Sequence, residues 1–157
     1  MDGVILTFLK RIHNPKGDLY HAMKKSDTGY AGFGEAYFSS VHSATIKGWK
    51  KHTKMISNIV VIFGEVDFVI YNENIDEFYN IKLSQNNYQR LTIQTGLWLA
   101  FRGIEKNNIL FNLSNIEHDP EEVINTDLNK IYVHQTGGSP NSIAQVEVGD
   151  VVAEDTS

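Results

Sequence analysis

The sequence at residues 59–66 is Ile59-Val60-Val61-Ile62-Phe63-Gly64-Glu65-Val66, a strong strand signal broken by a glycine. Its first five residues are an uninterrupted run of β-branched and aromatic side chains, which is typical of a strand buried on both faces. Gly64-Glu65 interrupts the run, and residues 66–71 resume it as a strand that we expect to pair with the first. The sequence therefore predicts a β-hairpin at the centre of the core.

More short strands are predicted on both sides of this centre, separated by turn residues, at 4–9, 33–41, 78–83, 91–93, 97–101 and 109–113. Short strands at regular spacing are typical of a sandwich or a barrel. Helix signals are scarce. Asp119-Pro120-Glu121-Glu122-Val123 combines an N-cap, a proline and an acidic first turn, and it predicts one short helix or turn. We expect one all-β domain over residues 1–134, followed by a tail over 135–157 that cannot form its own core.

Composition limits the kinds of partner and site. The chain has 157 residues, a formal net charge of −5 and no cysteine. A negative surface repels nucleic acid, so a site for an anion has to be a local cluster of cations. The absence of thiols excludes disulfides, thiolate metal sites and cysteine nucleophiles. No signal peptide is recognised and the longest apolar run is too short to span a bilayer, so we expect a cytoplasmic protein without membrane insertion.

A cluster of cations lies at Ile46-Lys47-Gly48-Trp49-Lys50-Lys51-His52. Three amines, an imidazole and an indole on one strand suggest a pocket for an anionic guest. Strict alternation would put Lys47 on the opposite face from Lys50 and His52, but a bulge at Gly48 would bring Lys47 and Lys50 to the same side. We predict that Lys50 and His52 point into the barrel.

We predict that Lys50 and His52 are catalytic and that Trp49 packs beside them. Crowding by neighbouring amines favours a neutral Lys50 that can act as a base, and an imidazole exchanges protons near neutral pH. Simpler roles stay open. The lysines can protect an exposed edge strand from aggregation, His52 can be structural, and Trp49 and Trp98 can be core or interface aromatics.

The order and spacing of five segments resemble the dTDP-4-dehydrorhamnose 3,5-epimerase family, over about residues 5–127. The segments are Asn14-Pro15-Lys16-Gly17-Asp18-Leu19-Tyr20, Ile46-Lys47-Gly48-Trp49-Lys50, Phe63-Gly64-Glu65-Val66, Leu83-Ser84-Gln85-Asn86-Asn87 and Leu91-Thr92-Ile93-Gln94-Thr95-Gly96. Residues 47–52 and 116–120 are similar to a shorter, divergent branch associated with surface-polysaccharide synthesis. The resemblance implies a cupin jelly roll (a double-stranded β-helix), a homodimer and a nucleotide-sugar ligand.

The resemblance also implies a reaction without a cofactor. Family members remove a proton next to the keto group of a dTDP-4-keto-6-deoxy sugar, stabilise the enolate and return a proton on the other face. The implied substrate shell comprises Lys16, Glu35, Tyr37, Lys47, Trp49, Asn112 and His118. Cupin metal sites use a His-x-His pair, which this sequence lacks, so we expect no catalytic metal.

The chain departs from the family at most catalytic positions. Lys47 stands at the position of the family's Arg, Lys50 at that of its catalytic His, and Leu99 at that of a second His. The position of the family's Tyr falls at Phe111 or Asn112, and the Asp partner of its His has no counterpart that can be aligned. The favoured reading is an epimerase or isomerase. The alternatives are an inactive cupin that binds a nucleotide sugar or a partner enzyme of the pathway, and an unrelated jelly-roll binding module.

Overall fold

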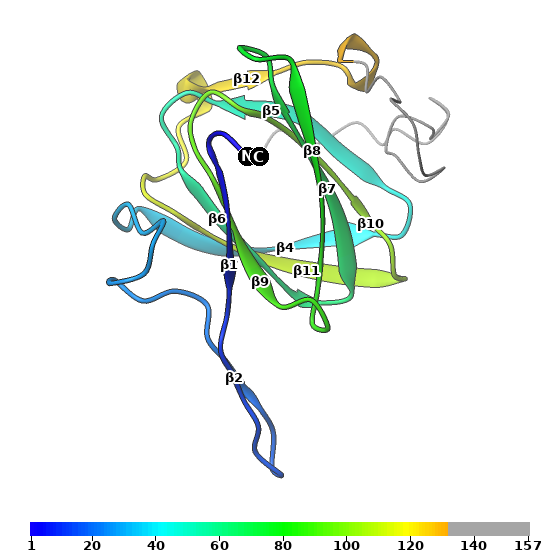
Figure 1. Ribbon diagram of the computed structural model, residues 1–157. Coiled ribbons are helices and arrows are strands. Elements are labelled where there is room, and N and C mark those ends of the chain that lie inside the picture. Colours follow the sequence, from blue (N-terminus) through cyan, green and yellow to red (C-terminus); the bar gives the residue numbers. More distant parts are fainter. Residues whose placement is uncertain (132–157) are drawn as a thin grey trace.

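Two five-stranded antiparallel sheets form the body of the protein (Figure 1), and the computed structural model describes residues 1–131. The first sheet has the strand order β1-β9-β6-β11-β4, and the second has the order β12-β5-β10-β7-β8. The all-β jelly roll predicted from the sequence is confirmed. The strands are β1 (Val4–Phe8), β2 (Arg11–Ile12), β3 (Leu19–Tyr20), β4 (Glu35–His42), β5 (Ile46–His52), β6 (Ser57–Phe63), β7 (Glu65–Asn72), β8 (Glu77–Ser84), β9 (Gln89–Ile93), β10 (Trp98–Gly103), β11 (Asn107–Ser114) and β12 (Val123–Asn125).

Only two short 3-10 helices occur in the described residues, η1 (Pro120–Glu122) and η2 (Leu128–Lys130). The short helix predicted at Asp119 corresponds to η1. The Asp119 side chain caps the start of η1 by accepting a hydrogen bond from the Glu121 amide at 3.0 Å. No helix within residues 1–131 is long and apolar enough to cross a membrane. The predicted tail at 135–157 lies outside the described residues.

The two central strands lie in different sheets. β6 pairs with β9 and β11, whereas β7 pairs with β8 and β10. The predicted hairpin over residues 59–71 is therefore wrong, because the chain passes from one sheet to the other at Gly64. Gly64 has φ +74°, and a Cβ there would lie 2.4 Å from the Asn107 carbonyl oxygen, so this corner requires glycine. The burial predicted for residues 59–63 is confirmed for Ile59 to Val61 and wrong for Phe63, which is 53% exposed.

The main core fills the space between the sheets with inward-facing apolar side chains. Its buried members are Val4, Val41, Ile59, Val61, Val66, Phe68, Ile70, Tyr79, Ile81, Leu83, Leu91, Ile93, Leu97 and Leu110. A smaller cluster lies on the outer face of the second sheet. There Trp49, Val69, Trp98 and Ala100 pack with the partly buried Leu128 and Ile131, so the segment after β12 covers this face.

One end of the barrel is closed by Asn108. Its Oδ1 accepts hydrogen bonds from the amides of Glu65 (2.9 Å) and Glu105 (3.1 Å), and its Nδ2 donates to the carbonyls of Val41 (2.9 Å) and Glu105 (2.7 Å). These bonds join β4, the start of β7 and the β10–β11 turn. The end of β5 and the start of β4 lie at the opposite end.

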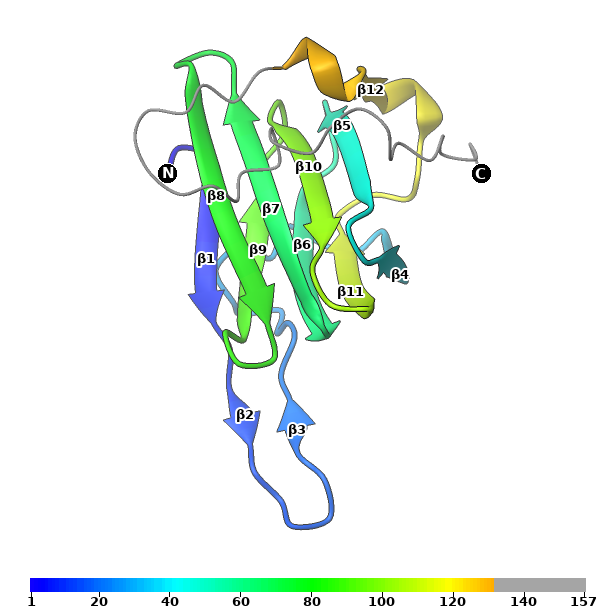
Figure 2. The ribbon, with the colours of Figure 1, turned by 90° about the vertical axis from the view of Figure 1, so that its right-hand side faces the viewer.

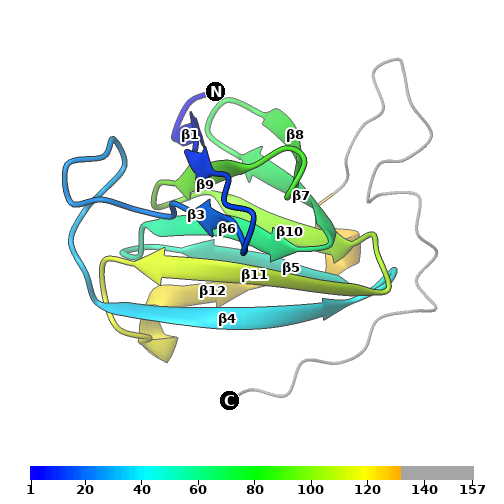
Figure 3. The same cartoon turned by 90° about the horizontal axis from the view of Figure 1, so that it is seen from below.

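Two features extend beyond the barrel. The β2–β3 hairpin projects from the body as an arm (Figure 2). Strand β4 forms the edge of the first sheet, next to β11 (Figure 3). Phe8 at the end of β1 is 83% exposed, and Phe38 on β4 is 68% exposed. Large apolar groups are therefore exposed both at the base of the arm and at the sheet edge.

Candidate active site

The basic strand β5 contains the predicted bulge. Lys50 lies opposite Leu99 and Lys47 lies opposite Phe101, so the two residues between the lysines face only Ala100 on β10. Residues opposite each other on paired strands share a face. Leu99 and Phe101 pack against the main core. Lys47 and Lys50 are therefore both on the inner face, as the sequence predicts for a bulge at Gly48.

Gly48 is the residue that makes this bulge possible. Its φ is +132°, and a Cβ at this position would lie 2.7 Å from the Ala100 Cα and from the Leu99 carbonyl oxygen. A side chain would therefore collide with the backbone of β10. The close approach of the two strands depends on glycine.

His52 is two residues beyond Lys50 and shares its face by strand alternation. Its Nδ1 is hydrogen-bonded to Oε1 of Glu122, a residue at the end of η1. The His52 side chain is 20% exposed, whereas the Glu122 side chain is fully buried. The imidazole therefore has one edge held by a buried carboxyl group.

Glu122 is a carboxylate near neutral pH despite its burial. Burial by itself raises the pKa of Glu122, but the hydrogen bond with His52 and those from the amides of Lys54 and Met55 together lower it. Its Oε2 accepts from the amides of Thr53 and Lys54 at 2.9 Å and from that of Met55 at 3.2 Å. The loop after β5 thus forms a socket of amides around one carboxylate oxygen.

This socket fixes the tautomer of neutral His52. A carboxylate only accepts hydrogen bonds, so the Nδ1 atom facing Glu122 Oε1 has to carry the proton. The second ring nitrogen, Nε2, is then left with a lone pair. A histidine held in this way by a buried carboxylate is suited to accept a proton at Nε2.

The facing wall of the site comes from β4 and β11. Tyr37 lies opposite Asn112, and Asn112 Nδ2 donates to the Tyr37 hydroxyl at 3.0 Å. Lys47 Nζ donates to Ser39 Oγ at 3.4 Å and so joins β5 to β4. Ser39, Tyr37 and Glu35 share the inner face with the core residue Val41 by alternation. Six predicted residues therefore lie on inner strand faces in this half of the barrel: Glu35, Tyr37, Lys47, Lys50, His52 and Asn112.

Trp49 is not in this group, and the expectation that it packs beside Lys50 and His52 is wrong. It is 2% exposed within the outer cluster, and its Nε1 donates to the Leu128 carbonyl at 3.3 Å. The bulge separates Trp49 from the inner face. Lys51 is also on the outer face, 4.6 Å from the centre of the Trp98 ring and ion-paired with Glu73.

Two further predicted residues lie apart from the inner face. Lys16 is in the turn at the tip of the β2–β3 arm, which points away from the barrel of its own chain. His118 is exposed in the segment between β11 and η1. Neither is brought to the six inner residues within one chain.

Glu122 is the functional candidate that sequence reasoning missed. The acidic run at 121–122 was explained by the helix start, which uses Asp119 as its cap. The contact with His52 spans 70 positions and depends on β12 pairing with β5, with Val123 opposite His52. No local pattern encodes that pairing. The only signal is the family's Asp partner of the catalytic His, for which the sequence offers no counterpart that can be aligned.

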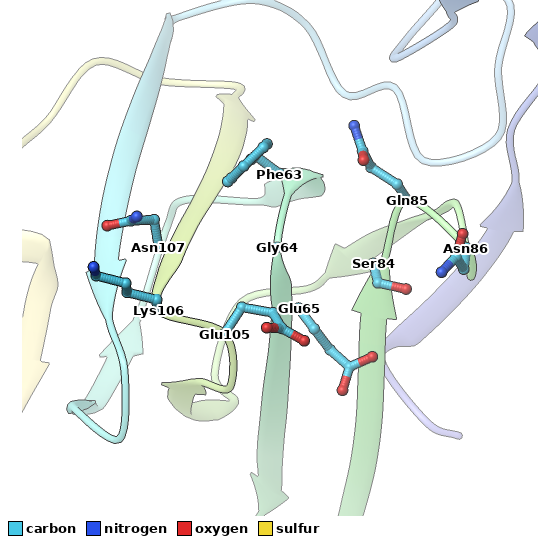
Figure 4. A pocket seen from close by; sticks show the side chains of 9 residues that line it. All are labelled: Phe63, Gly64, Glu65, Ser84, Gln85, Asn86, Glu105, Lys106 and Asn107. Atoms are coloured by element: carbon cyan, nitrogen blue, oxygen red, sulfur yellow. The ribbon is translucent and has the colours of Figure 1, made fainter.

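The depression that Figure 4 shows is elsewhere. It has a volume of about 440 Å³ and is lined by the turns β6–β7, β8–β9 and β10–β11, including Phe63, Gln85 and Lys106. These turns are at the end closed by Asn108, away from His52. Within residues 1–131 no group of three or more His, Asp or Glu side chains is placed to hold a metal ion.

Among the comparisons with known proteins, only the one with solved structures found matches, and these support the fold. No family model matches the chain, and no curated protein matches it. A dTDP sugar isomerase from Desulfovibrio desulfuricans G20 is similar at a TM-score of 0.78 and 24% identity, over 82% of this chain and 87% of that one. The sugar 3,4-ketoisomerase QdtA from Thermoanaerobacterium thermosaccharolyticum, solved with TDP, is similar at a TM-score of 0.70 and 21% identity. The match covers 79% of this chain and 88% of that one.

A third similar structure is the 3,5-epimerase RmlC from Legionella pneumophila, solved with dTDP-4-keto-L-rhamnose. It matches at a TM-score of 0.72 and 16% identity, over 82% of this chain and 74% of that one. The chain therefore has the cupin jelly-roll fold shared by these dTDP-sugar isomerases and epimerases. The resemblance seen in the sequence is confirmed at the level of the fold.

Proposed function

We propose that this protein is an epimerase or isomerase of a dTDP-4-keto-6-deoxy sugar, acting without a cofactor by removing a proton next to the keto group. The observation that carries the proposal is the His52–Glu122 pair. A buried carboxylate fixes an imidazole on the inner face of a barrel whose structural neighbours are dTDP-sugar isomerases and epimerases. Fold alone does not define a function, so the site has to support it.

In the proposed reaction His52 is the base. Its Nε2 takes the proton from the carbon beside the carbonyl, and the electron pair of that C–H bond forms the enolate. Glu122 stabilises the imidazolium that results, since its carboxylate faces Nδ1. Lys50 and Lys47, on the same inner face, are the cations proposed to stabilise the negative enolate oxygen.

Lys50 is assigned here as a cation rather than as the base. The crowding on which the base role rested is reduced, because Lys51 lies on the outer face against Glu73 and Lys54 is exposed. Glu35, Tyr37 and Asn112 are proposed to contact the sugar from the opposite wall. The exposed Lys16 and His118 are proposed to bind the nucleotide diphosphate, Lys16 by reaching the site of a second copy.

Solvent exchange tests the proposal. dTDP-4-keto-6-deoxyglucose is incubated with the protein in heavy water, and deuterium at C3 and C5 is followed by NMR. We expect uptake that falls about 100-fold or more in His52→Asn, the usual range for loss of a general base. His42→Asn, which changes an exposed histidine at the end of β4, is the matched control and should keep full uptake.

The alternative is an inactive cupin that binds the nucleotide sugar or a partner enzyme. The replacement of the family's Arg and His by Lys47 and Lys50 favours this alternative. Binding of the sugar nucleotide raises the melting temperature whether or not it is turned over. Protection against heating without any deuterium uptake would therefore support the binding protein over the enzyme.

The proposal includes a homodimer formed at β4. This strand ends its sheet, and Phe38 on its outer face is 68% exposed and in contact with Phe111, with 5.3 Å between ring centres. Exposed edges and apolar patches of this kind are typical of interfaces. Light scattering during gel filtration should give twice the chain mass, and Phe38→Asp should give monomers. Phe63→Asp, at the closed end, is the control and should stay dimeric.

A further inference from the structure

Tyr37 has a hydrogen-bonding pattern that suggests a chemical role beyond contact with the sugar. Its hydroxyl accepts a hydrogen bond from Asn112 Nδ2 at 3.0 Å, and the side chain is 43% exposed although it comes from an inner strand face. The phenol is thus anchored on one side and open to solvent on the other. The role argued below rests on the proposed function.

The direction of the Asn112 hydrogen bond follows from its neighbours. Asn112 Oδ1 accepts from the backbone amide of Asn58 at 3.1 Å. A backbone N–H can only donate, so it fixes the amide oxygen toward β6 and turns the amide nitrogen toward Tyr37. Asn112 is 2% exposed, which holds this orientation. The Tyr37 oxygen is therefore the acceptor, and the phenol proton is not used in this bond.

The position of Tyr37 relative to His52 follows from the two sheets. Tyr37 is on β4 of the first sheet, and His52 is on β5 of the second. The bond between Lys47 Nζ and Ser39 Oγ joins these strands near the closed end. From that bond toward the open end, β4 next presents Tyr37 on its inner face and β5 presents Lys50 and then His52. The phenol and the imidazole thus approach a guest from opposite walls.

We infer that Tyr37 is the proton donor and that the reaction is an inversion at carbon. A single base that removes and returns a proton on one face can move a keto group between neighbouring carbons, but it cannot invert a centre. Inversion needs a donor on the face opposite the base. Tyr37 lies on the wall opposite His52, and its phenol proton is not used in the bond with Asn112. The hydrogen bond that Asn112 donates to the phenol oxygen would stabilise the tyrosinate left after the proton is given up.

The proton and electron balance is complete without another reactant. His52 Nε2 takes the proton from one face, and the C–H electron pair becomes the enolate double bond. The enolate then takes the Tyr37 proton on the other face: a new C–H bond forms, the Tyr37 O–H bond breaks and the carbonyl is restored. The tyrosinate regains a proton from solvent and the imidazolium releases one, so the sugar is changed only in configuration.

The test separates proton removal from inversion. dTDP-4-keto-6-deoxyglucose in heavy water is followed by NMR for deuterium uptake and for the inverted epimer. We expect wild-type protein to give deuterated epimer. Tyr37→Phe should still put deuterium into sugar of unchanged configuration, because His52 is intact, while formation of the epimer falls about 100-fold or more. Tyr71→Phe, whose hydroxyl bonds Asp76 on the outer face, is the matched control and should invert normally.

Four results would count against the donor role. Full inversion by Tyr37→Phe would overturn it, as would loss of uptake and inversion together, because the tyrosine would then act in binding or folding. Uptake by wild-type protein with no inverted product would overturn it while leaving the proposed function intact. No uptake by wild-type protein would overturn the proposed function itself. Melting curves of Tyr37→Phe serve as the control that the variant is folded under the conditions of the exchange experiment.

Discussion

Replacing Glu122 with glutamine should change the tautomer of His52. The glutamine oxygen can still accept the amides of Thr53, Lys54 and Met55, which leaves its NH₂ group facing His52 Nδ1. Since an amide nitrogen only donates, Nδ1 has to become the acceptor and the ring proton moves to Nε2. The base would then carry a proton where it should have a lone pair. If the protein is the proposed enzyme, uptake of deuterium should fall by about 10⁴, as in other enzymes where an orienting carboxylate is made neutral.

The effect on stability is smaller and can be worked out from the same contacts. Three amide hydrogen bonds to a charged oxygen become bonds to a neutral one, and each weakens by about 1 kcal/mol. The variant also avoids the cost of burying a charge, which offsets part of this loss. We expect a net loss of about 2 kcal/mol, or a fall in melting temperature of about 4–8 °C for a chain of this size.

Nitrogen-15 NMR of the imidazole reads the tautomer directly and needs no substrate. At a pH where the ring is neutral, wild-type His52 should show Nδ1–H and the Glu122→Gln variant should show Nε2–H. Glu121→Gln changes the exposed neighbour on the same turn and should leave both the tautomer and the melting temperature unchanged. An Nε2–H tautomer in the wild-type protein would refute the reasoning from the amide socket, whatever the variant does.

Three other predictions concern the closed end, the bulge and two carboxylates. Asn108→Ala removes four hydrogen bonds at the closed end and should cost about 3 kcal/mol in urea unfolding, whereas the exposed Asn107→Ala should cost less than about 0.5 kcal/mol. Gly48→Ala should destabilise the fold by more than about 2 kcal/mol in thermal unfolding, because its Cβ meets β10 at 2.7 Å; an unchanged melting temperature would contradict the bulge. The pKa of Glu122 is lowered as described, and that of Asp27 is lowered by the Lys24 amide and Arg90 against the opposing effect of burial. Their stabilisation is therefore complete above about pH 5 and is lost progressively as the pH falls below about 4 and through the lowered pKa of each folded-state carboxyl group. Urea midpoints at pH 3 and pH 7 measure this, and equal midpoints would show that neither carboxylate contributes.

The sequence predicts the strands well because each carries its own local pattern. Residues 59–63 are continuously apolar, and the observed β6 begins only two positions earlier. Strand pairing is harder to predict from the sequence, because it depends on the sheet to which each strand belongs. The Gly64 corner has the composition of a hairpin turn, yet it joins two sheets. Turn residues indicate that the chain changes direction, but not where it goes next.

In the candidate site, too, features encoded by local sequence were predicted, and features that depend on long-range pairing were not. The bulge at Gly48 and the inner placement of Lys47 and Lys50 follow from one glycine in a basic strand, and they were predicted. The outward position of Trp49 follows from the same bulge, but no local pattern indicates which face of the strand offers apolar neighbours to the indole. The Glu122 contact needs β12 to pair beside β5, and this is a long-range result of folding.

The outer cluster makes the segment after β12 observable without a label. Both tryptophans of the chain, Trp49 and Trp98, lie beneath this segment, on the opposite face of the sheet from His52. Intrinsic fluorescence should therefore report release of residues 123–131, through a red shift of the emission as the indoles meet water. The emission wavelength should change little when a small molecule enters the barrel, because both indoles lie outside it. Because Glu122 immediately precedes residues 123–131, the same red shift would also indicate that the carboxylate beside the proposed base has lost its support.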